Sequence, residues 1–356
     1  MTSKERVLCA IHHQQPDRVP VDFRFCKEKL EELKSHLQMT EAEVFEYIGQ
    51  DVVTIRPAFR KAVTDIKYAD PTIRIDDRGY YYDIYGVPFR EITAMGQTYL
   101  ELANEYVLGD AADIEALDAH HWPSPNDWDY SGIHGQILRH ATEAVWARSR
   151  GVFQTAQFMR GFDNFLIDLM ADEDFAKALM DRIYAFVRED AKRTLEAGQR
   201  QYTFIEYNDD VATQRGMMIS PELWRKMLRP YMEDFCSLAH SHGAFVRYHS
   251  CGSIVEIIED LIDIGVDILN PVQPLAEGMD PLLLKDRFGD RICFHGGLDT
   301  QRLLPEGSPE ETRQQVRRLI DIAGKGGGYI LAGSHTLQID ARTENILAAA
   351  DEALGR

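Results

Sequence analysis

The sequence predicts an α/β protein with a (β/α)8 TIM-type barrel and an insertion between the second and third strands. Eight short apolar runs alternate along the 356 residues with stretches that have the periodicity of amphipathic helices. Polar and titratable residues follow most of these runs directly, which is where a parallel barrel gathers its functional groups. We therefore expect one barrel domain that covers residues 1–356.

The N-terminal part of the chain supplies the first two expected strands. Helices are predicted over residues 3–13, 28–37 and 41–48, and strands are predicted over residues 19–23 and 51–55. The alternation of strand and helix therefore begins close to the N-terminus.

The regular alternation breaks down between residues 57 and 150, which are rich in aromatic residues, Asp and Pro. Long insertions of this kind often carry function, because they lie on the surface around a rigid scaffold. We expect this segment to form one or two β-hairpins and to cover the mouth of the barrel as a cap.

After residue 150 the alternation becomes regular again. Six further strands are predicted, over residues 152–156, 201–206, 244–248, 267–270, 291–295 and 328–332. Helices separate them, including a long amphipathic helix over 172–197 and the last helix over 343–353. Another helix begins at Ser220, because Ser caps a helix N-terminus well and the Pro that follows suits the first helical position.

Composition and charge limit the classes of function. The formal net charge of −19 opposes non-specific binding to nucleic acid and to anionic membrane surfaces. The five cysteines show no paired spacing, which argues against a disulfide framework and for a reducing compartment. The first residues lack the apolar stretch of a signal peptide, and no apolar run reaches transmembrane length. A cytoplasmic protein without nucleic-acid or membrane partners is expected.

The most informative local pattern follows the strand predicted over residues 244–248. His249 and Cys251 stand two residues apart, and Gly252 then lets the chain turn. In an extended segment, side chains at positions i and i+2 point to the same side, so the imidazole and the thiol converge. Nitrogen and sulfur donors suit zinc, and we predict a zinc site here. The alternative is a packed histidine beside an inert, buried cysteine.

Other strand ends supply candidates for substrate binding and proton transfer. The residues predicted to bind substrate are Arg24, Arg56, Gln157, Asn270 and Gln273. Asp209 and Asp210 follow the strand over 201–206 and are candidates for acid–base catalysis, with a role in a turn or helix start as the alternative. His335 follows the last strand and is a candidate metal ligand or catalytic group, unless it only bonds a loop carbonyl.

These residues lie in stretches that resemble the uroporphyrinogen decarboxylase superfamily, and within it the methyltransferases that serve corrinoid proteins. The matching stretches are Glu5-Arg-Val with Pro16-Asp-Arg-Val-Pro20, Asn208-Asp-Asp with Ile219-Ser-Pro221, His249-Ser-Cys-Gly252, Asn270-Pro-Val-Gln273, His295-Gly-Gly-Leu-Asp299 and Gly328-Tyr-Ile-Leu-Ala-Gly-Ser-His335. They are spread over nearly the whole chain, and the resemblance implies the distorted (β/α)8 barrel of that superfamily.

The resemblance also implies a cofactor and a partner. Methylcobamide:coenzyme M methyltransferases look similar in the His-x-Cys element, with which they bind zinc, and they use a second Cys after the last strand as third ligand. This chain has Ser334 and His335 at that place. Zinc is therefore expected to be bound by His249, Cys251 and a third ligand, for which His335 is the first candidate and Glu206 the second. A small methyl donor or acceptor (a thiol or a methoxy compound) and a corrinoid carried by a partner protein are implied as well.

Two alternative functions stay open at this point. True decarboxylases of the superfamily carry a His in the loop that His335 occupies, but they lack the His-x-Cys pair and have an Arg-rich N-terminal segment where this chain has only Arg24. A cofactor-free decarboxylase of tetrapyrrole biosynthesis, with Asp209 stabilising a protonated pyrrole, is therefore ranked second. A non-catalytic protein that binds a metal or a corrinoid is the third alternative. The direction of methyl transfer and assembly into a homodimer also stay open.

Overall fold

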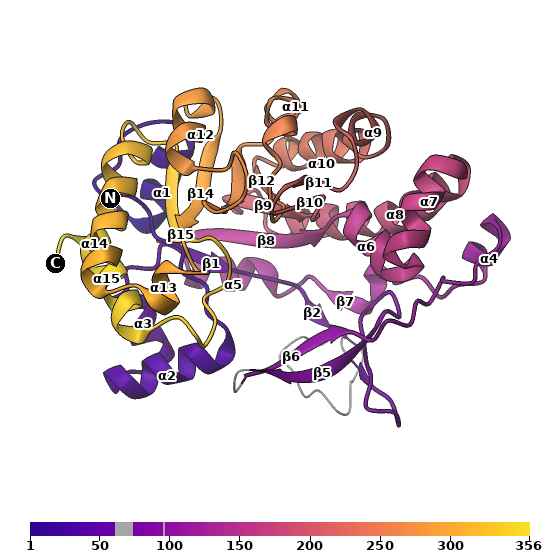
Figure 1. Ribbon diagram of the computed structural model, residues 1–356, viewed down its shortest axis with the longest axis horizontal. Helices are drawn as coiled ribbons and strands as arrows, with labels where there is room; N and C mark the ends of the chain where they lie inside the picture. Colours follow the sequence, from indigo (N-terminus) through magenta and orange to yellow (C-terminus); the bar gives the residue numbers. More distant parts are fainter. Residues whose placement is uncertain (61–73, 95–96) are drawn as a thin grey trace.

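The computed structural model describes residues 1–60, 74–94 and 97–356. Its centre is a curved sheet of seven parallel strands in the order β1-β8-β9-β12-β13-β14-β15 (Figure 1). The strands are β1 (Val52–Thr54), β8 (Ala144–Arg150), β9 (Phe204–Asn208), β12 (Phe245–His249), β13 (Ile268–Val272), β14 (Cys293–Leu298) and β15 (Tyr329–Gly333). Parts of the expected insertion, residues 61–73 and 95–96, lie outside the described residues.

Residues around Val21 join the two edges of this sheet. Val21 forms parallel bridges with Gln50, which precedes β1, and with Leu331 in β15. The amide of Asp51 donates to the carbonyl of Val21 at 2.9 Å, and the amide of Asp22 donates to the carbonyl of Leu331 at 2.9 Å. The segment predicted as the first strand therefore occupies the eighth place, with single bridges instead of a full ladder. This arrangement confirms the TIM-type α/β fold.

The interior of the barrel is apolar at one end and charged toward the other. At the N-terminal ends of the strands, Val7 and Ile11 of α1 (Ser3–Ile11) pack in one cluster with Phe204 of β9 and Ile268 of β13. Further along the same strands, inward positions carry buried charged and polar side chains. Burial of charge is expensive unless it is paired, so these polar positions point to the functional end of the barrel.

Helices surround the sheet. Besides α1, and apart from the segment between β1 and β8, they are α2 (Lys27–Leu37), α3 (Glu41–Tyr47), α6 (Val152–Arg160), α7 (Phe162–Ala171), α8 (Glu173–Ala197), α9 (Pro221–Met227), α10 (Arg229–Ser241), α11 (Ile258–Asp263), α12 (Pro281–Phe288), α13 (Leu303–Glu306), α14 (Pro309–Arg318) and α15 (Thr343–Leu354), with the short helical segments η2 (Val255–Ile257) and η3 (Leu319–Ala323). The long helix predicted over 172–197 is confirmed as α8. Ser220 caps α9 as expected, since its side chain accepts a hydrogen bond from the amide of Leu223.

The third strand lies earlier in the chain than the sequence predicts. Residues 144–150 form β8 between β1 and β9, whereas residues 152–156 belong to helix α6, so the predicted strand there is wrong. A short apolar run fits a buried strand and the buried face of a helix equally well, which explains the error. The expected insertion over 57–150 therefore includes one barrel strand, and Gln157, expected at a strand end, lies within α6.

Between β1 and β8 the chain forms antiparallel structure. The elements here are β2 (Ala58–Phe59), β3 (Arg74–Ile75), β4 (Tyr81–Tyr82), β5 (Pro88–Ala94), β6 (Gln97–Leu102), α4 (Ile114–Asp118), η1 (Pro125–Asp127), β7 (Trp128–Asp129) and α5 (Ile133–Arg139). Strands β3 to β6 make one sheet, and β2 pairs with β7. The β5–β6 hairpin projects from the body of the fold (Figure 1), which confirms the expected hairpin. A second small hairpin, β10 (Ala212–Thr213) with β11 (Gly216–Met217), follows β9.

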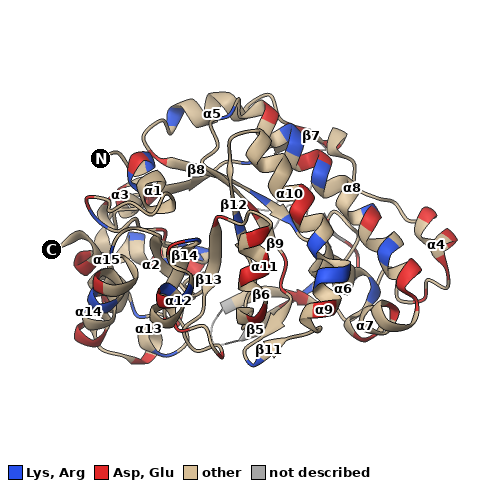
Figure 2. Cartoon of the chain, turned by 90° about the horizontal axis from the view of Figure 1, so that it is seen from above, with Lys and Arg blue, Asp and Glu red and all other residues tan. Residues whose placement is uncertain are grey.

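Acidic residues occur on several of the outer helices. Figure 2 shows acidic positions on α4, α11 and α14, around the outside of the sheet. Among the described residues, no helix combines the length and the apolar character needed to cross a membrane.

Candidate metal centre at the mouth of the barrel

Three potential metal ligands meet at the carboxyl ends of β9 and β12. One ligand atom each from Asp210, His249 and Cys251 lie within 4.8 Å of one another. The Nε2 atom of His249 lies 3.8 Å from Sγ of Cys251 and 3.9 Å from Oδ1 of Asp210. The sequence predicts the convergence of the histidine and the cysteine, and the structure adds the carboxylate of Asp210.

Parallel strand pairing brings the carboxylate to the histidine. In the register of β9 and β12, Asn208 stands opposite His249, so Asp210 follows at the same edge of the sheet as Cys251. The backbone amide of Cys251 donates to Oδ1 of Asp210 at 2.8 Å, and Nε2 of Gln154 donates to Oδ2 at 2.7 Å. Both oxygens of Asp210 are thereby oriented, although the side chain sits in a loop.

The tight turn after Cys251 requires glycine. Gly252 has a φ of 87°, and a Cβ on this residue would lie 2.4 Å from the carbonyl oxygen of Thr213. A side chain would collide with backbone there, so the close approach of this turn to β10 depends on Gly252.

His249 presents a bare nitrogen to the other two groups. Its Nδ1 lies 2.7 Å from Oδ1 of Asn270, and an amide oxygen only accepts, so Nδ1 carries the hydrogen. Nε2 is then left with a lone pair that faces Cys251 and Asp210. Desolvation by burial lowers the pKa of His249 to about 4, which keeps the ring neutral. Nitrogen, sulfur and carboxylate donors around one point are a donor set that zinc takes, with room for a further ligand.

The two residues predicted as third ligand stand apart from this group. Among the described residues, the cluster of potential ligands contains Asp210, His249 and Cys251, but neither Glu206 nor His335. The ring centroid of His335 lies 6.4 Å from that of His249. His335 and His249 nevertheless line the same cavity of about 200 Å³.

Glu206 lines that cavity and belongs to a buried ionic network. Its Oε2 lies 2.7 Å from Nη2 of Arg247, and both side chains are at most 1% exposed. Although burial alone would raise the pKa of Glu206, the charges of Arg247 and Arg24 lower it to about 2. Arg247 also lies 3.4 Å from Asp22 and 3.1 Å from Nδ1 of His295. The carboxylate of Glu206 is therefore committed to arginines in this structure, with Arg247 at 2.7 Å and Arg148 at 3.4 Å.

The comparisons with known proteins now assign the family. The sequence model of uroporphyrinogen decarboxylase (URO-D) matches residues 103–354, which is more than half of the chain. The chain belongs to the URO-D family. Among curated proteins, a uroporphyrinogen decarboxylase from Psychromonas ingrahamii is 31% identical over 88 residues, which cover 25% of this chain and 23% of that protein. The alignment thus spans about a quarter of that relative's length.

A solved structure shares the fold over the whole chain. A methyltransferase from Methanosarcina mazei is similar with a TM-score of 0.66 and 18% sequence identity, and the alignment covers 100% of this chain and 99% of that one. This likeness shows a shared fold, in agreement with the seven-stranded sheet and its closure at Val21.

In this URO-D family member, Asp209 has the contacts of a helix cap. It is buried, and its carboxylate accepts hydrogen bonds from the amides of Phe153 at 3.2 Å and Gln154 at 2.8 Å, at the start of α6. Burial nevertheless raises the pKa of Asp209 to about 7. A Cβ at Gly151 would lie 2.2 Å from Asp209, so this contact needs glycine at that position. The predicted catalytic role of Asp209 stays a prediction.

Of the residues predicted to bind substrate, some line the cavities at the mouth and others only contact neighbouring residues. Asn270 accepts a hydrogen bond from His249, and Arg24 lines the cavity beside His249. Arg56 lies at neighbouring cavities of about 290 and 1030 Å³. The side-chain amide of Gln273 accepts from the amide of Gly252 at 2.8 Å and thereby supports the turn. Gln157 lies 3.9 Å from the sulfur of Met218 and is not among the residues that line these three cavities.

The sequence interpretation missed two arginines because it placed the third strand too late. Arg148 and Arg150 stand at the carboxyl end of β8, and Arg148 lines all three of these cavities. The signal was present in the sequence as an apolar run, residues 144–147, followed by these two arginines and a glycine. Such a strand-to-helix junction at Gly151 would have put both arginines at the mouth.

Proposed function

We propose that this URO-D family member is a zinc-dependent methyltransferase that moves a methyl group between a small substrate and a corrinoid carried by a partner protein. The observation that carries the proposal is the direction of His249, whose bare Nε2 faces Sγ of Cys251 at 3.8 Å and Oδ1 of Asp210 at 3.9 Å. The full-length fold match to a methyltransferase supports this branch over the decarboxylases.

In this proposal His249, Cys251 and Asp210 hold the zinc, so Asp210 takes the place that we first expected for His335 or Glu206. A zinc ion bound there supplies Lewis acidity toward a thiol or a methoxy group of the substrate. Asn270 keeps the hydrogen of His249 on Nδ1, and outer-shell hydrogen bonds of this kind orient metal ligands.

The remaining groups at the mouth act on the substrate. His335 lines the cavity beside His249 and would exchange a proton with the reacting group through its imidazole. The arginines at the strand ends would hold an anionic part of the substrate. Arg24 serves this purpose well because, among the residues that the structure describes, it donates to an amide oxygen, that of Asn270 at 3.4 Å, and forms no ion pair with a carboxylate.

Decarboxylation of a porphyrinogen is the second candidate, and charge disfavours it. A porphyrinogen polycarboxylate needs a cation for each of many acidic groups. At this mouth Arg247 is committed to Glu206 and Asp22, and Arg150 is paired with Asp83. The arginines that remain suit one or two acidic groups.

Metal analysis tests the metal site. Protein purified without chelators should contain about one zinc per chain, and Cys251→Ala should lose most of it with the fold unchanged. Cys9→Ala, in α1 and away from the mouth, is the matched control and should keep the zinc. Wild-type protein without bound metal, or Cys251→Ala with full metal content, would contradict the proposal.

Two activity assays separate the candidate functions. Methyl transfer to or from a corrinoid protein distinguishes the methyltransferase from a non-catalytic binding protein. Incubation with uroporphyrinogen, followed by a search for coproporphyrinogen, tests the decarboxylase. Efficient formation of coproporphyrinogen would reverse the ranking.

A further inference from the structure

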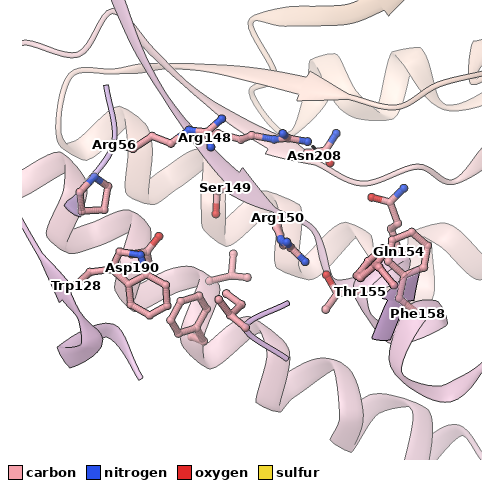
Figure 3. A pocket seen from close by; sticks show the side chains of 15 residues that line it. Arg56, Trp128, Arg148, Ser149, Arg150, Gln154, Thr155, Phe158, Asp190 and Asn208 are labelled. Atoms are coloured by element: carbon pink, nitrogen blue, oxygen red, sulfur yellow. Dashed lines mark hydrogen bonds between the residues drawn. The ribbon is translucent and has the colours of Figure 1, made fainter. Parts of the chain in front are cut away.

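A second cavity, of about 290 Å³, lies beside the candidate metal centre and has two chemically different sides. One side is aromatic, with Phe89, Trp128, Phe158 and Phe186 among the lining residues. Arginines from the ends of β1 and β8 make the other side. Figure 3 shows Arg56 and Arg148 along one edge of the cavity, with Trp128 on the opposite edge. The volume is just below the ~300–1,000 Å³ typical of ligand pockets, so it suits a single ring.

The arginine side carries positive charge that the neighbouring carboxylates offset only in part. Arg148 lies 3.4 Å from Glu206, which it shares with Arg247, and donates a hydrogen bond to Asn208 at 3.2 Å. Arg56 has no ion pair with any carboxylate among the residues that the structure describes. The pKa of Arg148 is lowered, first by desolvation and then by neighbouring arginines including Arg56, with Glu206 opposing. Two guanidinium groups side by side at one edge of a cavity suit the binding of an anion, and arginine binds carboxylates through two parallel hydrogen bonds.

The aromatic end of the cavity contains a negative group. Asp190 lines it near Trp128 (Figure 3) and accepts a hydrogen bond of 2.6 Å from the hydroxyl of Tyr130. A second acidic group on the ligand would be repelled at this end. The charge pattern therefore fits a ligand with one carboxylate, bound at the arginine edge.

The cavity also shares contacts with the metal centre. Arg148 lines both this cavity and the smaller one beside His249. Gln154 lines the aromatic cavity as well, and its Nε2 donates to Oδ2 of Asp210 at 2.7 Å. In Figure 3, Gln154 lies at the end of the cavity away from Arg56. A ring whose carboxylate is bound at Arg56 and Arg148 would thus direct its far edge toward Gln154 and the metal ligands.

We infer that this cavity binds a small aromatic monocarboxylate, with the carboxylate at Arg56 and Arg148 and the ring against the aromatic side chains that line the cavity. The role of this ligand as methyl donor or acceptor rests on the proposed function, but its binding does not. The ring covers the apolar side of the cavity, which would otherwise stay in contact with water. The two arginines fix the orientation of the ligand through its carboxylate.

Binding of benzoate to the full chain tests the inference, with and without zinc. Isothermal titration calorimetry should show one benzoate per chain in both forms. Benzamide, which has the same shape without the charge, and acetate, which has the charge without the ring, should each bind at least about tenfold more weakly. Arg56→Gln should also weaken benzoate binding about tenfold or more, because it removes a charge-assisted hydrogen bond to the carboxylate. Arg90→Gln is the matched control, since Arg90 is exposed on β5 and does not line the cavity.

A second variant tests the aromatic side. Phe158→Leu keeps an apolar residue at a partly exposed position, so it should fold, and it should weaken benzoate more than acetate. Failure of wild-type protein to bind benzoate, equal binding of benzoate and acetate, or unchanged binding by Arg56→Gln would each overturn the inference. Benzoate binding in a protein that never takes up zinc would support this site while contradicting the proposed metal function. Zinc uptake without benzoate binding would contradict this site while supporting the proposed metal function.

Discussion

The Nδ1 atom of His249 lies 2.7 Å from the Oδ1 atom of Asn270, across the pair of strands β12 and β13. The two residues are register partners at the carboxyl ends of these strands, so the contact is fixed by the backbone ladder. It sets the tautomer of His249, and thereby turns a histidine at a strand end into a directed nitrogen ligand.

Asn270→Ala should weaken zinc binding about 10–100-fold, the usual cost of losing an outer-shell partner of a metal-binding histidine. Asn270→Asp, which still accepts from Nδ1, should retain most of the affinity. Competition with a chromophoric chelator measures both values. Asn126→Ala, at an exposed position in η1, is the control and should bind like wild type. Equal zinc affinity of Asn270→Ala and wild type would show that the ring is oriented by other contacts.

His335→Ala should keep its zinc, because His335 is outside the group of Asp210, His249 and Cys251. Methyl transfer should fall about 10²-fold or more if the imidazole exchanges a proton with the substrate. Metal content and single-turnover rates, measured on the same preparation, check the two expectations. Loss of zinc would instead make His335 a ligand, and unchanged zinc with unchanged rate would leave it a structural residue.

Glu206→Gln should destabilise the protein by about 3–5 kcal/mol, because it leaves the fully buried Arg247 without its closest carboxylate. Zinc content should stay unchanged, in contrast to the expectation for a metal ligand. Urea denaturation and metal analysis give the two readings. Glu352→Gln removes the partner of Arg317, which is 55% exposed, and should cost only about 0–1 kcal/mol. A stable Glu206→Gln protein that has lost zinc would make Glu206 a ligand after all.

Asp190 should make stability depend on pH in the acidic range. Burial raises its pKa to about 6, although the hydrogen bond from Tyr130 and the charge of Arg193 oppose the shift. An unfolded Asp titrates near ~3.9, so the folded state binds more protons between these values. The contribution of Asp190 to stability is complete below about pH 4 and is lost as the pH rises through about 6.

Asp190→Asn should therefore be as stable as wild type at pH 4 and more stable at pH 7.5. Urea midpoints at the two pH values measure the difference. Asp174→Asn, on the exposed side of α8, is the control and should leave the pH dependence of wild type unchanged. If Asp190→Asn showed the same pH dependence as wild type, Asp190 would not be the group responsible.

Local chemistry was readable from the sequence. His249 and Cys251 were expected on the same side of one extended segment, and their donor atoms lie 3.8 Å apart. The cap at Ser220 and the long helix α8 were also predicted correctly. Each of these features depends on residues close together in the chain, where the geometry of a strand or a helix turn gives the answer directly.

Features that depend on strand register could not be derived in the same way. Residues 152–156 have the composition of a strand, but tertiary packing places them in α6, and the correct strand carries Arg148 and Arg150 to the mouth. Apolar composition does not distinguish a buried strand from the buried face of a helix. The aromatic cavity follows from this placement and was therefore not visible in the sequence.

The sequence by itself determined the alternation of strands and helices, the family resemblance and the pairing of His249 with Cys251. The tertiary structure decided which carboxylate joins them: Asp210 approaches His249, whereas Glu206 is bound to Arg247. In the sequence, both carboxylates stand at or just after the end of the strand predicted over residues 201–206. The physical difference is that Glu206 points into the barrel toward a buried cation, while Asp210 lies past the strand end, where parallel pairing of β9 and β12 brings it to the metal ligands.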